Sequence, residues 1–300
     1  MTEAPPTSSP EPTQTTTPEQ ATEQPTEQPT ATVLPTTPIK HIFVIILENK
    51  SKQAVFYNSY FNNLAKQGVQ LTHYYGVSHP SEPNYLAMIA GDTFVTDDGS
   101  YNLPQTNLVD LMEQANVTWK AYLEDYPGSC FAGGSADALY ARKHNPFISF
   151  DDVRTDVERC SNLVNADQLD SDIAAGQLPQ FSFYVPNLKN DGHDTSVDYS
   201  ANWLQSFLDP KLADPHFMDG TLVMITFDET DDFNADPSTQ TLYAVLLGPM
   251  VQAGTTNPTP YTHYSLLRTV EDTFNLGTLR RNDESATPFD ACIFSGGCAK

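Results

Sequence analysis

Two stretches of the sequence decide the fold: residues 41–49, HIFVIILEN, and residues 221–229, TLVMITFDE. In each, a run of about seven mostly apolar residues is followed at once by acidic or amide side chains. Continuous apolar runs of this length are typical of parallel strands that are buried on both faces. We therefore expect both runs to be central strands of one sheet.

Similar runs elsewhere predict further strands, at residues 69–77, 119–123, 181–185 and 242–247. Segments with apolar residues at three- and four-residue spacing lie between the strands and predict helices, at residues 57–66, 84–90, 107–114, 202–208 and 265–274. This alternation predicts an α/β fold with a mostly parallel central sheet flanked by helices. Because no second linker interrupts it, residues 39–300 are expected to form one catalytic domain.

Polar side chains follow four of the predicted strands, in the pairs Glu48-Asn49, Glu124-Asp125 and Asp228-Glu229 and in residues 187–194. In open α/β sheets, ligands bind beyond the carboxyl ends of the strands. One such ending would mean little, since strands commonly stop at Asp or Asn in turns. Four of them predict a shared acidic pocket.

We expect Glu48, Asn49, Asp228 and Glu229 to bind a divalent metal ion. Buried carboxylates left together without a cation would be costly, and hard divalent ions accept such oxygen ligands. The alternative is that they are ordinary turn and helix-cap residues. The ligands suit calcium, magnesium or manganese, while zinc and iron stay open, so the identity of the ion is unknown.

The segment HPSEPNY, residues 79–85, follows a predicted strand and precedes a predicted helix, which places Ser81 at a helix N-terminus. That position favours an incoming phosphate and an activated serine oxygen. The alternative is a simple N-cap serine.

Histidines in three polar loops are candidates for metal binding or proton transfer, namely His144, His193 and His263. Each has a hydrogen-bonded loop histidine as its alternative. The strongest candidate is His193, because Asp191 and Asp194 flank it.

The formal net charge is −23, and residues 39–300 keep −18 of it once the five glutamates of the first 38 residues are set aside. Such a charge argues against a nucleic-acid partner. An anionic substrate would need a local cation to enter this field.

Residues 1–38 hold 9 of the 23 prolines, 12 threonines and no Lys or Arg before position 40. A segment so poor in apolar residues is expected to be a disordered Pro/Thr-rich stalk, suited to a secreted or cell-surface protein and to a tether; a cytosolic tail is the alternative. No apolar stretch is long enough for a transmembrane segment, and no signal peptide is visible.

Four cysteines favour two local disulfides, Cys130 with Cys160 and Cys292 with Cys298. Reduced, buried cysteines are the alternative.

An ordered series of motifs, which includes ILENKS, THYYGVSHPSEPNY, KHNPFISF, LPQFSFYVPNLKNDGHD and TLVMITFDE, resembles the phosphoesterase family of acid phosphatases and phosphatidylcholine-type phospholipases C. The resemblance runs from residue 39 to the region of Gly277 and implies an alkaline-phosphatase-like fold. It also implies Ser81 as a nucleophile on the metal, Asn84 as a contact for phosphoryl oxygens, and His144, His193 and His263 as catalytic residues. Asp191 and Lys143 are expected on the substrate side.

Where two-metal members have an Asp and a His four residues apart, this chain has Asp191-Gly192-His193, which departs from the two-metal pattern. The resemblance implies an acid phosphatase that hydrolyses small-molecule phosphate monoesters through a phosphoserine. A phosphodiesterase or phospholipase C is the alternative within enzymes. A non-catalytic cell-surface binding module is the alternative outside them.

Overall fold

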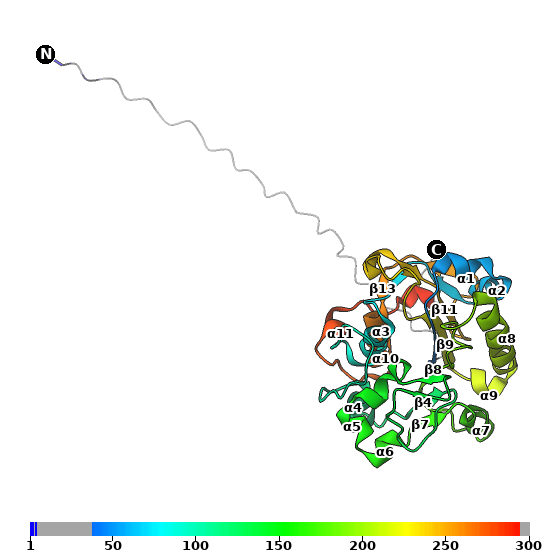
Figure 1. Cartoon of the computed structure of the whole chain (residues 1–300). Coiled ribbons are helices and arrows are strands. Elements are labelled where there is room, and N and C mark those ends of the chain that lie inside the picture. Colours follow the sequence, from blue (N-terminus) through cyan, green and yellow to red (C-terminus); the bar gives the residue numbers. More distant parts are fainter. Residues whose placement is uncertain (3, 5–37, 295–300) are drawn as a thin grey trace. The chain divides into compact units, whose positions relative to one another are not determined.

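The computed structural model describes residues 1–2, 4 and 38–294 of the chain. The predicted stalk lies outside the described residues, apart from Met1, Thr2, Ala4 and Pro38. The α/β prediction is confirmed: Figure 1 looks along a twisted sheet with helices on both sides.

The large sheet has eight strands in the order β12-β2-β11-β9-β1-β8-β4-β7. Their bounds are β1 His41–Leu47, β2 Val69–Leu71, β4 Trp119–Leu123, β7 Leu163–Asn165, β8 Phe181–Val185, β9 Thr221–Phe227, β11 Ala244–Leu247 and β12 Thr255–Asn257. β1 lies between β8 and β9 and is parallel to both, and β4 continues the parallel part between β8 and β7. Only β11 runs antiparallel to its neighbours β9 and β2 within the described sheet.

The other described strands form two smaller sheets. One joins β3 Tyr74–Tyr75 to β10 Thr241–Leu242 and β13 Tyr261–Thr262, and the other is the hairpin of β5 Ser135–Ala136 and β6 Tyr140–Ala141. The first small sheet brings the segment before Ser81 next to the segment before His263.

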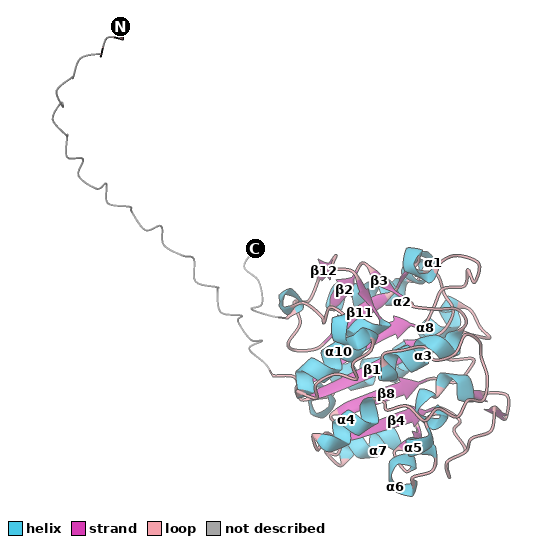
Figure 2. Ribbon diagram, turned by 90° about the vertical axis from the view of Figure 1, so that its left-hand side faces the viewer, coloured by secondary structure: helices cyan, strands magenta, loops and turns pink. Residues whose placement is uncertain are grey.

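Helices cover both faces of the large sheet, as Figure 2 shows for α3, α4 and α10 in front of the strands. On that face lie α3 Ser81–Ala90, α4 Leu108–Gln114, α5 Asp151–Arg154, α6 Val157–Cys160 and α10 His263–Phe274, with α11 Asn282–Ser285 against α10. On the other face lie α1 Lys52–Tyr57, α2 Ser59–Gln67, α7 Gln168–Ala174, α8 Val197–Ala213 and α9 Pro215–Met218. Short 3-10 helices occupy Arg142–His144, Pro146–Ser149, Pro237–Thr239 and Ala291–Ile293.

The side chains of β1 show why its apolar run is continuous. Val44 and Ile46 pack into one layer of core, while Phe43 and Ile45 pack into the layer on the opposite face. All four are fully buried. A strand enclosed on both faces has no solvent side on which a polar residue would be tolerated.

Two predicted strands are wrong in extent. The run at residues 69–77 is broken by a turn at Thr72-His73, so β2 and β3 belong to different sheets. The run at residues 242–247 is broken at Tyr243 into β10 and β11. In both cases the chain crosses from one sheet to another, which a run of apolar residues does not reveal.

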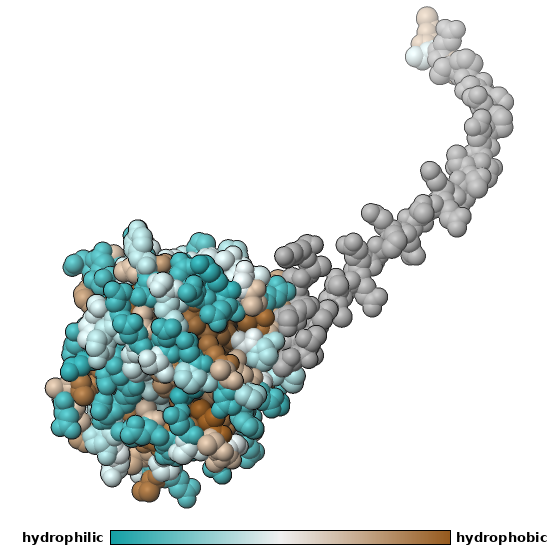
Figure 3. All heavy atoms as spheres, turned by 90° about the vertical axis from the view of Figure 1, so that its right-hand side faces the viewer, coloured by the Kyte–Doolittle hydropathy of each residue, from teal (hydrophilic) through white to brown (hydrophobic). Residues whose placement is uncertain are grey.

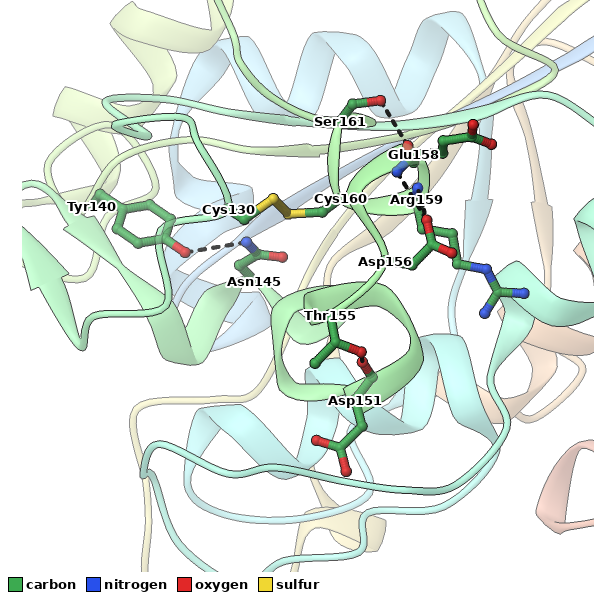
Figure 4. The surroundings of a disulfide bond; sticks show 10 residues. All are labelled: Cys130, Tyr140, Asn145, Asp151, Thr155, Asp156, Glu158, Arg159, Cys160 and Ser161. Carbon is green, nitrogen blue, oxygen red and sulfur yellow. Dashed lines mark hydrogen bonds between the residues drawn. A yellow bond between two sulfur atoms is a disulfide. The ribbon is translucent and has the colours of Figure 1, made fainter.

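The disulfide between Cys130 and Cys160 is present, with the two Cα atoms 5.7 Å apart (Figure 4). It closes a loop of about 30 residues that includes Lys143 and His144. Such a cross-link stabilises the fold by roughly 3 kcal/mol, chiefly by restricting the unfolded chain. The second predicted pair involves Cys298, which lies outside the described residues.

Figure 3 shows that the face on the side of α8 is mostly hydrophilic, with apolar residues in small groups. The large apolar side chains that are exposed in the described residues lie far apart in the sequence: Met1, Tyr57, Val157, Tyr199 and Phe233. None of the helices in this described part is long and apolar enough to cross a bilayer.

Candidate active site

The carboxyl ends of β1 and β9 lie side by side, because these strands pair in register up to Leu47 and Phe227. The backbone N–H of Asp228 donates to the Leu47 carbonyl at 3.0 Å, which continues the pairing by one residue. Asn49 then turns the chain with φ of 53°, a conformation that asparagine tolerates. Its N–H donates to Asp228 Oδ1 at 3.2 Å. The sequence-predicted pairs 48–49 and 228–229 are thus brought together.

Ser81 is the first residue of α3, and Pro80 is the N-cap. The Ser81 hydroxyl lies 3.0 Å from Glu48 Oε2 and 3.0 Å from Glu229 Oε1. The alternative of an N-cap serine is therefore wrong, since the side chain faces two carboxylates instead of capping the helix. All three side chains are buried.

Burial makes these acids hard to ionise. It raises the pKa of Glu229 to about 9 and that of Asp228 to about 6, and the nearby Asp228 charge adds to the rise for Glu229. For Glu48, burial and then the charges of Asp228 and Asp191 hold the pKa well above its ordinary value. A cluster of this kind is stabilised by a positive charge placed among its oxygens.

A divalent cation fits the donor atoms of this cluster. Asn49 Oδ1 and Asp228 Oδ2 are both buried and have no hydrogen-bond partner. Within the described residues, no three His, Cys, Asp or Glu side chains form a ready-made ligand group. The candidate set is therefore a mixed one, which adds the Asn49 amide and the Ser81 hydroxyl to the carboxylates, all of them hard oxygen donors.

Tyr85 and His144 stack on each other and both contact Glu48. The Tyr85 hydroxyl donates to Glu48 Oε1 at 2.5 Å, and its ring stacks on His144 with centroids 5.1 Å apart. His144 lies between two acids, with Nε2 3.3 Å from Glu48 Oε1 and Nδ1 3.4 Å from Asp191 Oδ2. Burial and the charge of Lys143 nevertheless hold the pKa of His144 well below its ordinary value.

Lys143 supplies a positive charge at the rim. Its ammonium donates to Asp98 Oδ2 at 2.9 Å and lies 3.3 Å from His193 Nε2. Although burial works against the charged form, nearby acids, Glu48 first and then Asp98, raise the pKa of Lys143, so it stays protonated. His193 is partly exposed and also contacts Asp194, with Nδ1 2.8 Å from Oδ1. Asp191 holds the same loop through its Oδ1, which accepts from the His193 N–H at 2.7 Å.

Asn84 and His263 sit behind the cluster. Asn84 Oδ1 accepts from the N–H groups of Val77 and Ser78, and its amide donates to the carbonyls of Ser78 and Pro80. His263 Nε2 contacts the Asp228 carbonyl at 2.6 Å, and its Nδ1 contacts the Tyr74 hydroxyl at 3.1 Å. In this structure both residues hold the backbone of the site, and the catalytic roles implied for them by resemblance stay predictions.

Glu124 does not join the shared pocket, so that part of the prediction is wrong. It lines a separate crevice of about 350 Å³, together with Asp125, Asn165, Asn187 and Lys211. The reason is lateral distance: β4 is separated from β9 by β8 and β1, so its carboxyl end opens onto another part of the sheet edge.

Three residues of the site had no predicted role, namely Tyr85, His79 and Asp98. Tyr85 had a signal, since it lies four residues after Ser81 on a predicted helix and so shares its face. The ring of His79 contacts Glu229 Oε2, a residue 150 positions away. Asp98 joins the Lys143 ammonium to the N–H of Glu82, which donates to its Oδ1 at 3.0 Å. Nothing local in the sequence indicates either long-range contact.

A model described as the phosphoesterase family matches residues 57–277. The chain belongs to this family. The matched region contains Ser81, Lys143, His144, His193 and the Asp228-Glu229 pair, while Glu48 and Asn49 precede it.

Curated relatives in this family match most of the chain. A probable acid phosphatase of Kluyveromyces lactis is 37% identical over 82% of this chain and 61% of its own length. An acid phosphatase of Aspergillus fumigatus is 33% identical over 90% of this chain and 64% of its own length. A phosphatidylinositol-3-phosphatase of Mycobacterium tuberculosis is 32% identical over 82% of this chain and 80% of its own length. The chain thus spans less than two thirds of the two fungal relatives.

Solved structures support the same fold at low sequence identity. A protein of the alkaline phosphatase superfamily from Vibrio parahaemolyticus superposes with a TM-score of 0.58 at 14% identity, over 83% of this chain and 71% of that one. Murine ectonucleotide pyrophosphatase/phosphodiesterase 5 superposes with a TM-score of 0.54 at 9% identity, over 83% of this chain and 99% of that one. The alkaline-phosphatase-like fold predicted from the sequence is confirmed.

Proposed function

We propose that this chain is a metal-dependent phosphatase that hydrolyses small-molecule phosphate monoesters with Ser81 as the nucleophile. The observation that carries the proposal is the Ser81 hydroxyl, which starts a helix and lies 3.0 Å from each of two buried carboxylate oxygens. A serine with only a structural role would not need Glu48 and Glu229 beside it, because burial strongly opposes the ionisation of both acids. The names of the relatives, acid phosphatases and a phosphatidylinositol phosphatase, support the same class of reaction.

Glu48, Asn49, Asp228 and Glu229 would hold the divalent ion, with the Ser81 oxygen as a further donor. When bound, the ion supplies charge stabilisation for the phosphoryl oxygens and lowers the pKa of a coordinated hydroxyl. Hard oxygen donors dominate this set, which suits magnesium, calcium or manganese. The identity of the ion is left to experiment.

In the first step, Ser81 Oγ forms a bond to phosphorus while the bond between phosphorus and the ester oxygen breaks. With the ion bound, Glu48 and Glu229 would be ionised despite their burial, and Glu48 Oε2 and Glu229 Oε1 would be the acceptors within reach of the serine proton. The leaving oxygen takes up a proton and departs as the alcohol. His193, which is 30% exposed and contacts Asp194 through Nδ1, would supply that proton.

In the second step, water attacks the phosphoserine. A new bond forms between the water oxygen and phosphorus while the water gives one proton to His193, which lost its own in the first step. The bond to Ser81 Oγ breaks, and Ser81 recovers its proton from the carboxylate that took it. Inorganic phosphate leaves. Lys143 is the cation that faces the phosphoryl oxygens in both steps, because its ammonium is held at the rim by Asp98.

Replacing the nucleophile tests this function most sharply. Ser81→Ala should lower turnover of p-nitrophenyl phosphate by several orders of magnitude, as in other covalent hydrolases. Because Ser81 does not cap α3, the melting temperature should hardly change. Residual activity above about a tenth of wild type, roughly 1.4 kcal/mol in barrier, would contradict the assignment. A chelator should abolish wild-type turnover, and added divalent ions should restore it.

Secretion with a surface tether remains part of the proposal. The disulfide between Cys130 and Cys160 supports an oxidising compartment. Removing residues 1–38 should leave turnover and melting temperature almost unchanged, since that segment has few apolar residues with which to dock. A fall of more than a few degrees would contradict the stalk interpretation.

A further inference from the structure

His79 contacts the candidate metal cluster although no motif assigned it a role. Its Nδ1 contacts Glu229 Oε2, while Glu229 Oε1 lies 3.0 Å from the Ser81 hydroxyl. The two oxygens of this carboxylate therefore have different partners. One faces the imidazole ring, and the other faces the proposed nucleophile.

The surroundings of His79 keep this contact out of water. The His79 side chain is 13% exposed and that of Glu229 is 1% exposed. The ring of Phe233 meets the His79 ring edge-on, with centroids 5.7 Å apart. Thr230 and Pro237, from the loop after Glu229, line the same narrow space. A hydrogen bond in such a place competes weakly with solvent and holds its acceptor firmly.

Without the His79 contact, the Glu229 carboxylate would keep the Ser81 hydroxyl as a partner but would be less restrained about its terminal bond, a torsion with a broad distribution in glutamate. A ligand that must be ordered when the ion binds loses affinity to that ordering. Outer partners that orient a ligand typically change metal affinity by 10- to 100-fold.

We propose that His79 is a positioning residue, which donates its Nδ1–H to Glu229 Oε2 and so orients the other oxygen, Oε1, toward Ser81 and the divalent ion. This inference rests on the proposed function. It assigns to His79 a role in metal affinity and not in proton transfer to the substrate. Phe233 takes part by covering the ring.

The test compares three single variants by their affinity for Mn²⁺, measured by titration of the chelator-treated full chain, with activity as a second readout. His79→Ala removes the donor. His79→Asn keeps an N–H donor near the position of Nδ1, in a side chain that lacks the ring. His73→Ala is the matched control, because His73 is exposed on the same segment and its Nδ1 contacts Thr72 instead of the cluster.

We expect His79→Ala to bind Mn²⁺ roughly 10- to 100-fold more weakly than wild type. His79→Asn should stay within about threefold of wild type, and His73→Ala should be unchanged. Saturating Mn²⁺ should restore most of the turnover of His79→Ala, because the reacting groups remain in place.

Equal Mn²⁺ affinity of wild type and a folded His79→Ala would overturn this inference alone. So would a His79→Asn protein that binds Mn²⁺ normally but has lost turnover by 100-fold or more, since His79 would then carry a proton in the reaction. If His79→Asn binds as weakly as His79→Ala, the donor is not what matters and the inference also fails. A wild-type protein that binds neither Mn²⁺ nor another divalent ion would overturn the proposed function together with it.

Discussion

Glu48 and Glu124 both follow a buried parallel strand directly, yet the protein treats the two carboxylates differently. Glu124 accepts hydrogen bonds from four groups: the Asn187 N–H at 2.9 Å, the Asn190 amide at 2.6 Å, the Tyr184 hydroxyl at 2.9 Å and the Trp203 indole at 3.1 Å. Glu48 has two hydroxyl partners, Tyr85 and Ser81, a longer contact of 3.3 Å with His144 Nε2, and two nearby acids. The hydrogen bonds of the fold satisfy Glu124, whereas we propose that a cation stabilises Glu48.

The difference shows how a functional acid is recognised. Burial alone raises the pKa of both residues, so burial does not separate them. The surrounding groups distinguish the two residues. Four hydrogen bonds to Glu124 oppose the rise of its pKa, whereas the charges of Asp228 and Asp191 add to the rise for Glu48. An acid that the protein leaves short of donors, beside others like it, is the candidate for metal binding.

The largest effect should come from Glu48→Gln. It removes a ligand charge and leaves the shape of the side chain intact, so turnover should fall by about 1,000-fold, or roughly 4 kcal/mol in barrier. Added divalent ion should restore part of it. The melting temperature in chelator should be equal to or above that of wild type, because a buried acid with too few donors is gone. A Glu48→Gln protein with normal turnover would remove Glu48 from the site.

Glu124→Gln should act the other way, on stability. The new amide group would point N–H donors at donors that already surround the side chain, which should cost about 2–3 kcal/mol of unfolding free energy in urea denaturation. Turnover of the folded protein should stay within a few-fold of wild type. Asp125→Asn is the matched control, since Asp125 is exposed and accepts a hydrogen bond from the Asn187 amide at 2.7 Å. Equal stability of both variants would contradict the comparison.

Glu271 is a third kind of buried acid, with neither four donors nor a candidate cation site. It is 1% exposed, and neither of its oxygens has a hydrogen-bond partner. Burial and then the charge of Asp283 raise its pKa to about 8, against smaller opposing effects of the nearby Leu279 N–H and then of Arg268. When protonated, it can donate to Asp283.

The sign of the resulting pH dependence follows from the raised pKa. The folded state binds a proton on Glu271 that the unfolded state releases near pH 4.5, so stability is lost as the pH rises from there toward about 8. Glu271→Gln should remove this loss, so the free energy of unfolding should fall by about 2–3 kcal/mol less between pH 5 and pH 7 than in wild type. Urea midpoints at several pH values would measure it. A variant with the same pH slope as wild type would show that Glu271 is not the group responsible.

The sequence predicted the centre of the fold better than its edges. The bounds of β1, β4, β8 and β9 agree with the predicted runs, because strands buried on both faces need continuous apolar residues. β7, Leu163–Asn165, was missed, since a three-residue edge strand carries too few residues for a pattern. The change of sheet between β2 and β3 was missed because it depends on pairing partners, β10 and β13, far along the chain.

The same contrast holds in the site. The carboxylates of Glu48, Asp228 and Glu229 follow strands, so the topology that places the strands also places them. Lys143 and His144 lie in the short 3-10 helix Arg142–His144, where the sequence suggested a polar loop. The loop histidine was a candidate on its residue type alone, and Lys143 was expected only on the substrate side. His79 escaped prediction because its partner is fixed by tertiary contact, and the functional value of a histidine depends on that partner.

The proposed metal site is tested most directly by the metal content of the purified wild-type protein. Elemental mass spectrometry would measure it beside Asp228→Asn and Glu124→Gln. We expect at least one divalent ion per wild-type chain, a similar content in Glu124→Gln and a clear loss in Asp228→Asn. That loss should be partly reversed by excess ion, with recovery of phosphatase activity. A wild-type protein that is fully active with no bound metal, and stays so in chelator, would contradict the account.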